Sequence, residues 1–315
     1  MLTHRNLLPI LALLLNAFIW GTSWWAFRQL ESQGLHPLWA TALIYLIAVL
    51  VIAWVRPQAF RQVARTPLLW TLMLASGLTN AAFNWGVVIG DVVRVVLLFY
   101  LMPLWTVVLA RVLLHEPLTR GAAVRVLLAL TGALIVLRPA DATGFIALPL
   151  PQTLSDWLGL IGGFTFALNN VMLKRAARHS DESRALAMFI GGMVVAGTLA
   201  ATLTVHRQIT WPPALTASWV ALALALALAL SACFLATNMA LQYGASRLSA
   251  NTTSVVMLTE VVFASTSAVL LGSGSVTPPL LLGGALIICA ALFAAFEPVA
   301  DGSLQRGGPG QGEGA

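Results

Sequence analysis

The stretch SVVMLTEVVFASTSAVLL, residues 254–271, carries a single carboxylate, Glu260, near the middle of an otherwise apolar run. A helix needs about 20 mainly apolar residues to cross the roughly 30 Å of hydrocarbon in a bilayer. A carboxylate at that depth is costly, and such residues usually face a protein interior or a water-filled cavity. The stretch therefore predicts a membrane helix whose acid has a special environment.

The whole chain has the composition of an integral membrane protein. Of its 315 residues, 59% are apolar and only 9% are charged, and the mean hydropathy is +0.88. The run ALALALALAL at 221–230 alternates two apolar helix formers, so it predicts a helix and not a strand. Apolar runs predict an all-α membrane protein with ten spanning helices, at residues 7–27, 38–55, 68–90, 92–114, 121–138, 155–176, 185–205, 218–242, 248–271 and 278–297.

The distribution of lysine and arginine predicts the orientation. With the N-terminus inside, thirteen of these residues fall in inner loops and four in outer loops. Basic residues are retained on the cytoplasmic side, so both termini are expected in the cytoplasm, with the chain spanning the inner membrane. The pI of about 10.3 then reflects topology and contact with anionic membrane lipid, and a nucleic-acid partner is not expected.

Three pairs of segments suggest an internal repeat. TGALIV (131–136) matches GGALII (283–288), and AFNWGVVIGD (82–91) and WGTSWWAFR (20–28) match ATNMALQYGA (236–245) and FALNNVMLK (166–174). We expect two five-helix repeats, at residues 1–140 and 141–300, followed by a disordered Gly-rich tail at 301–315. Because five is odd, the second repeat enters the membrane from the opposite side, which gives the inverted repeat of many secondary transporters.

Several segments resemble one transporter family. FIWGTSWWAF in the first span, YLMPLWTVVLARVLLHEPLT in the fourth and MLTEVVFASTSAVLL in the ninth look like the EamA family of the drug/metabolite transporter (DMT) superfamily, and most like a YddG-type aromatic amino acid exporter. The family's common Glu-Pro pair of the ninth span reads Glu260-Val261 here, and HEPLT of the first half becomes GSGSVT in the second. The second half has therefore lost the acidic residue of that loop motif.

The resemblance implies export of amino acids, aromatic and other neutral ones, and the inverted repeat adds alternating access. No cofactor is expected, and a monomer is one possible state of assembly. The alternative is efflux of drugs or organic cations, which the same superfamily also carries. An intramembrane enzyme is disfavoured because GASRL (244–248) only approaches a GxSxG motif and all five histidines fall at loops or span ends. No phosphate-binding loop or metal-binding motif is present in the sequence.

Amides placed in apolar spans are candidate cavity residues. Asn80 and Asn84 lie four residues apart in the third span, and Asn238 and Gln242 have the same spacing in the eighth. A buried amide needs a partner, so these faces are expected to point inward. Ordinary hydrogen bonds between helices are the competing interpretation. Asn169 and Asn170 could belong to an inner gate or be interfacial polar residues, and the second interpretation is preferred.

Aromatic residues, a proline and Glu260 complete the candidate site. Trp20, Tyr100 and Trp105 are expected to line an aromatic cavity, with ordinary packing as the alternative. Pro103 is expected to free a carbonyl that contacts substrate or forms a hinge, with a simple kink as the alternative. Glu260 is the candidate for proton coupling; the alternative is a structural acid that stays protonated and bonds Thr259, Thr253 or an amide from another span.

Overall fold

The structure is a computed structural model that describes residues 4–113, 120–137, 150–213, 217–245, 256–257 and 259–296. The regular structure of these residues is helical throughout. The helices are α1 (His4–Ser32), α2 (Pro37–Val55), α3 (Gln58–Arg65), α4 (Pro67–Ile89), α5 (Val92–Phe99), α6 (Met102–Leu113), α7 (Arg120–Leu137), α8 (Leu154–Arg175), α9 (Asp181–Val205), α10 (Ala217–Ala245), α12 (Thr259–Leu270) and α13 (Pro278–Phe296). The loop motif HEPLT and the Gly-rich tail lie outside the described residues.

The described helices support a multi-pass membrane protein. Six stretches are long and apolar enough to cross a bilayer, namely Leu7–Ser32, Pro37–Val55, Pro67–Ile89, Val92–Leu113, Asp181–Val205 and Leu224–Leu241. Shorter apolar segments in α7, α12 and α13 and the helix α8 fall in the other predicted spans. The count of ten spans stays a prediction.

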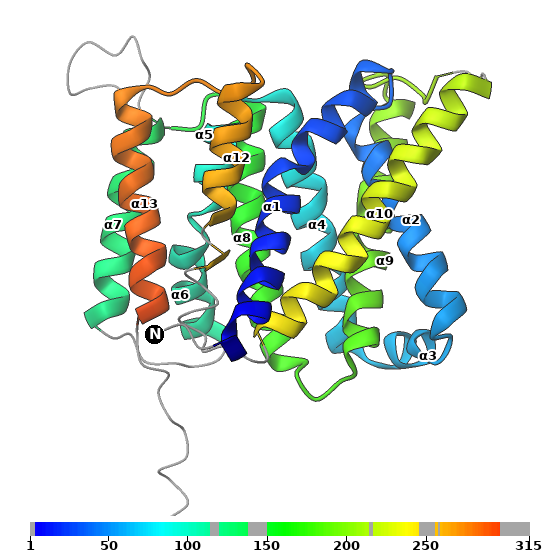
Figure 1. Cartoon of the computed structure of the whole chain (residues 1–315), viewed down its shortest axis with the longest axis horizontal. Coiled ribbons are helices and arrows are strands. Elements are labelled where there is room, and N and C mark those ends of the chain that lie inside the picture. Colours follow the sequence, from blue (N-terminus) through cyan, green and yellow to red (C-terminus); the bar gives the residue numbers. More distant parts are fainter. Residues whose placement is uncertain are drawn as a thin grey trace, which may run out of the picture.

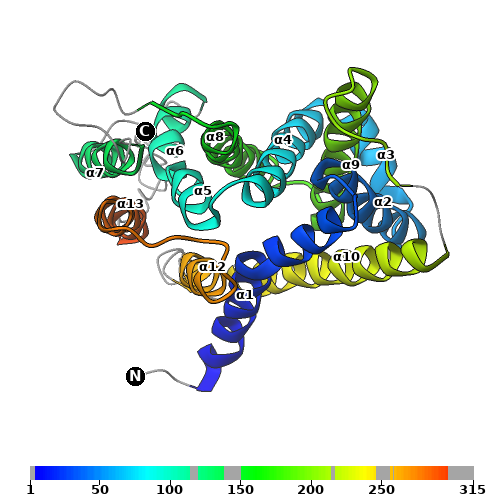
Figure 2. The same ribbon diagram turned by 90° about the horizontal axis from the view of Figure 1, so that it is seen from above.

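Figures 1 and 2 show how the helices are arranged, with α7 and α13 at one end of the molecule and α2, α3 and α9 at the other. Helix α1 packs on α10 and α12, while α8 packs on α4, α5 and α6; α2 packs on α9, and α7 packs on α13. If the first five predicted spans are exchanged for the last five, these contacts map onto one another. A twofold axis between two halves would produce this pattern.

Glycines allow the closest helix contacts. A Cβ atom on Gly191 of α9 would lie 1.9 Å from the carbonyl oxygen of Met73 in α4. Between α7 and α13, a Cβ on Gly132 would lie 2.6 Å from the oxygen of Gly283, and a Cβ on Gly283 would lie 2.7 Å from the oxygen of Gly132. The sequence match aligned Gly132 with Gly284, so this reciprocal contact shifts the pairing by one residue.

The fourth predicted span is two helices. Helix α5 ends at Phe99 and α6 begins at Met102, so Pro103 lies in the first turn of α6. The missing N–H of proline is tolerated there, because the first N–H groups of a helix have no partner within the helix. The span therefore breaks just before the proline, between Phe99 and Met102, and the role of Pro103 as a hinge stays a prediction. Phe99 lies four residues before Pro103, and its carbonyl oxygen is close to α8. A Cβ on Gly163 of α8 would lie 2.5 Å from this oxygen.

The short helix α3 lies between the predicted spans 38–55 and 68–90, where no helix is predicted from the sequence. Ala59 and Val63 are buried in α3, whereas Arg61 and Arg65 are exposed. One apolar face and one basic face are typical of a helix that lies along a membrane surface. Trp70 of α4 donates its indole N–H to the carbonyl of Val63 at 2.8 Å and fixes α3 on the bundle.

His36 caps the start of α2, and its surroundings lead to a testable prediction. Its Nδ1 accepts a hydrogen bond from the backbone N–H of Leu38 at 3.2 Å, and its ring meets the ring of Trp85 edge-on. Burial lowers the pKa of His36 from 6.5 to about 4. Protonation is therefore easier in the unfolded chain, and this residue's contribution to stability is complete above about pH 6.5 and falls as the pH drops toward 4.

We expect the unfolding midpoint of the wild-type protein in detergent to fall more between pH 7 and pH 4.5 than that of His36→Asn, which keeps a capping acceptor without a titrating group. Equal pH dependence of the two proteins would contradict the assignment.

Candidate functional site

A cavity of about 440 Å³ lies among the helices of the bundle. Side chains from α1, α2, α4, α5, α6, α8, α9, α10 and α12 line it, together with Tyr100 and Met257. Small-molecule sites in proteins are usually about 300–1,000 Å³ and mostly apolar with a few polar groups. Its size and lining fit a small organic molecule.

The structure brings together five of the predicted site residues around this cavity: Trp20, Asn80, Tyr100, Asn238 and Glu260. Gln242 and Pro103 belong to α10 and α6, but their side chains are outside the described part of the structure.

Asn84 and Trp105 are the two exceptions. The Asn84 side chain is 1% exposed and its Nδ2 donates to the hydroxyl of Thr41 in α2 at 3.1 Å. Trp105 packs edge-on against Phe164 of α8, with ring centroids 5.5 Å apart. The structure does not bring these two residues to the cavity, and their contacts lie between helices.

Other polar residues of the cavity were missed or assigned another role. Asn16, Asn169 and Asn170 line the cavity, and Asn16 and Asn169 are each only 2% exposed. The sequence held a signal for Asn16, because it lies four residues before Trp20 and so shares its helix face. Reading Asn169 as an interfacial residue was wrong.

Aromatic rings cover much of the cavity surface in two groups. Phe99 lies between Phe83 and Phe166, with ring centroids 4.8 and 5.2 Å apart. Trp20 stacks on Phe234 with centroids 4.6 Å apart and planes 4° apart. Such faces bind flat apolar groups by stacking and by burial of apolar area.

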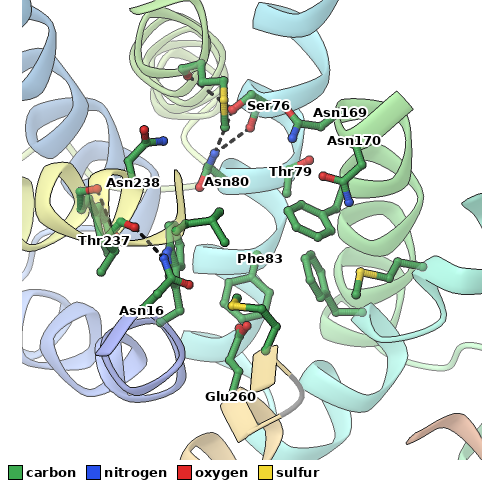
Figure 3. A pocket seen from close by; sticks show the side chains of 18 of the residues that line it. Asn16, Ser76, Thr79, Asn80, Phe83, Asn169, Asn170, Thr237, Asn238 and Glu260 are labelled. Carbon is green, nitrogen blue, oxygen red and sulfur yellow. Dashed lines mark hydrogen bonds between the residues drawn. The ribbon is translucent and has the colours of Figure 1, made fainter. Parts of the chain in front are cut away.

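Asn80 is fixed by its neighbours. Its Oδ1 accepts from the hydroxyl of Tyr45 at 2.5 Å, and its Nδ2 donates to the carbonyl of Ser76 at 2.8 Å. Figure 3 shows Asn80 held against Ser76 at the edge of the cavity. This amide therefore has its donor and acceptor already engaged.

Glu260 has a partner that the sequence did not indicate. The hydroxyl of Tyr100 lies 3.1 Å from Oε2 of Glu260 and 3.4 Å from the carbonyl oxygen of Met257. The hydroxyl of Thr259 donates instead to the carbonyl of Val256 at 2.6 Å, and Thr253 is outside the described residues. Glu260 is the only charged residue among the described residues that line the cavity.

Polar contacts join the helices at the end of the bundle where α1 ends, which the charge distribution predicts to be the outer end. Arg94 of α5 donates to both carboxylate oxygens of Asp156 in α8, at 2.6 and 3.0 Å, and to the carbonyl of Val136 in α7 at 2.6 Å. Asp91 accepts from the backbone N–H and hydroxyl of Ser275. These contacts join parts of both predicted repeats.

Part of the sequence matches a known protein family. Residues 7–138 match the EamA-like transporter family. This match covers most of the first predicted repeat and supports the superfamily part of the resemblance. The family consists of transporters of the DMT superfamily.

Solved structures show that the fold extends over nearly the whole chain. A crystal structure of a protein aligns with a TM-score of 0.55 and 18% sequence identity, covering 93% of this chain and 96% of that chain. This likeness concerns the fold alone. No curated protein matches the sequence.

Proposed function

We propose that the protein is a secondary transporter that exports amino acids, aromatic and other neutral ones, across the inner membrane. The central observation is the cavity, because its aromatic surfaces and amides suit an apolar side chain together with a polar head group. The EamA domain at residues 7–138 supports transport. The aromatic preference follows the resemblance to YddG-type exporters.

Alternating access between two inverted repeats is part of the proposal. Its support is the exchange of helix contacts between the first and last five predicted spans and the contacts of Arg94 and Asp91 that join the repeats at one end of the cavity. The break between α5 and α6 next to Pro103 is the proposed hinge. The excess of lysine and arginine in the predicted inner loops supports cytoplasmic termini.

Efflux of organic cations is the second candidate. Glu260 favours it, because a carboxylate in a low-dielectric cavity attracts a cation. Counterflow in proteoliposomes, with a panel of labelled amino acids and a cationic drug, separates the two. Competition by phenylalanine and tryptophan but not by the drug supports amino acid transport, and the reverse result overturns it in favour of cation efflux.

Glu260 is also the proposed proton-coupling residue, with a purely structural acid as the alternative. We expect Glu260→Gln, which keeps the shape of the side chain but cannot ionise, to remove the pH dependence of uptake into proteoliposomes. Asn84→Ala is the control, because this buried amide lies off the cavity. Unchanged uptake and pH dependence in Glu260→Gln would rule out coupling through this residue.

A further inference from the structure

Asn16 offers the cavity an unpaired hydrogen-bond acceptor. Its Nδ2 donates to the carbonyl oxygen of Thr237 in α10 at 2.9 Å. A carbonyl oxygen can only accept, so this bond fixes which end of the amide is nitrogen. Oδ1 of Asn16 has no partner among the described residues, although the side chain is 2% exposed. A buried acceptor without a partner is unfavourable, and a donor from a bound molecule would relieve the cost.

Glu260 supplies a second acceptor close to the same helix. Helices α1 and α12 are in direct contact, since a Cβ on Gly21 would lie 2.8 Å from the backbone oxygen of Glu260. Figure 3 shows the side chains of Asn16 and Glu260 both pointing into the cavity. The carboxylate can accept several hydrogen bonds, of which Tyr100 provides one.

The hydroxyl donors around the cavity are already engaged. The hydroxyl groups of Thr79, Thr106 and Thr237 donate to backbone carbonyls of their own helices. Tyr45 donates to Asn80. The described lining residues include no lysine, arginine or histidine. Asn16, Asn169 and Glu260 therefore present hydrogen-bond acceptors to a ligand, and Glu260 is the one carboxylate of the described lining.

From these contacts we infer that the cavity recognises its substrate by an ammonium group held between Asn16 and Glu260. The aromatic body of the substrate then packs on the rings of the cavity, such as Phe83 and Phe99. A substrate carboxylate is not required for binding. This inference rests on the proposed function of the same cavity and specifies its chemical class: aromatic primary amines, including amino acids through their amino end.

Binding of matched probes to the purified protein in detergent tests the inference. The probes are phenylethylamine and phenylalanine methyl ester, which have an ammonium group and no carboxylate, and N-acetylphenylalanine, which has the carboxylate and no ammonium group. A ligand of the folded state raises the unfolding midpoint with its concentration. We expect the two amines to raise it and N-acetylphenylalanine to leave it unchanged. Binding by N-acetylphenylalanine, or no binding by either amine, overturns the inference.

Two variants assign the recognition to Asn16. We expect Asn16→Ala to weaken binding of both amines about tenfold or more, the effect of losing one hydrogen bond to a charged group. Asn84→Ala removes a buried amide of the same kind away from the cavity and is expected to keep wild-type affinity. Equal weakening by both variants, or full affinity in Asn16→Ala, contradicts the assignment.

This test does not depend on transport. If the amines bind as expected but no substrate shows counterflow, the proposed transport fails and the binding site stands. If counterflow occurs and N-acetylphenylalanine competes as well as the amines, the transport proposal stands and ammonium recognition fails.

Discussion

Replacing Gly191 with alanine is expected to destabilise the protein strongly. A Cβ at this position would lie 1.9 Å from the carbonyl oxygen of Met73, and a Cβ on Gly77 would lie 2.4 Å from the oxygen of Gly191. Both obstacles are backbone atoms, so α4 and α9 would have to move apart. Overpacking of a tight contact costs about 1–3 kcal/mol and at times more. The loss is measured as a lower unfolding midpoint in detergent.

Gly197→Ala is the matched control because it changes the same helix, α9. Its nearest neighbour to an added Cβ is the Cβ of Ala42 at 3.6 Å, an ordinary contact. Alanine is favoured over glycine within a helix by up to about 1 kcal/mol, so this variant is expected to be as stable as the wild type or slightly more stable. Equal unfolding midpoints for the two variants would contradict the close contact between α4 and α9.

Arg94→Ala is expected to have a second large effect. Its guanidinium bonds both oxygens of Asp156, whose side chain is 1% exposed, and also the carbonyl of Val136. The substitution leaves the Asp156 carboxylate buried without its counter-ion. Loss of one partner of a buried ion pair costs about 3–5 kcal/mol. Because the Arg94 side chain is 28% exposed, we expect the lower part of that range.

Arg56→Ala provides the comparison for a surface ion pair. Arg56 and Glu182 are 3.6 Å apart, and their side chains are 64% and 46% exposed. Such pairs contribute about 0–1 kcal/mol, so little change in the unfolding midpoint is expected. The double variant Arg94→Ala/Asp156→Asn has no unpaired buried charge, so we expect it to recover part of the stability that Arg94→Ala loses. If Arg94→Ala is as stable as Arg56→Ala, the ion pair does not join α5 and α8 in the way described.

The helices were predictable because hydropathy and length act locally along the chain. The runs that became α2, α4 and α9 are apolar over a bilayer's thickness, and no distant contact is needed to recognise them. Helix α3 was missed because its eight residues show amphipathicity only over two turns. Pro103 indicated that the fourth span is irregular. The exact position of the break, after Phe99, was not predictable because it depends on how α5 and α6 pack against α8.

The site was partly predictable for the same reason. Spacing along a helix placed Asn80 and Asn84 on one broad face, but only Asn80 reaches the cavity, because α2 offers the hydroxyl of Thr41 to Asn84. The position of Glu260 within an apolar run could be read from the sequence, and the structure places it at the cavity. Its partner Tyr100, 160 residues away, could not, because that pairing depends on how distant helices meet.

Counterflow tests the central claim most directly. Proteoliposomes containing the full chain are loaded with unlabelled phenylalanine and diluted into trace labelled phenylalanine, without an imposed ion gradient. A carrier that alternates access through one cavity is expected to accumulate the label transiently above its external concentration. The same experiment with a labelled aromatic amine extends the test to the second candidate. Failure of both labels to exceed the level in protein-free liposomes would contradict the account.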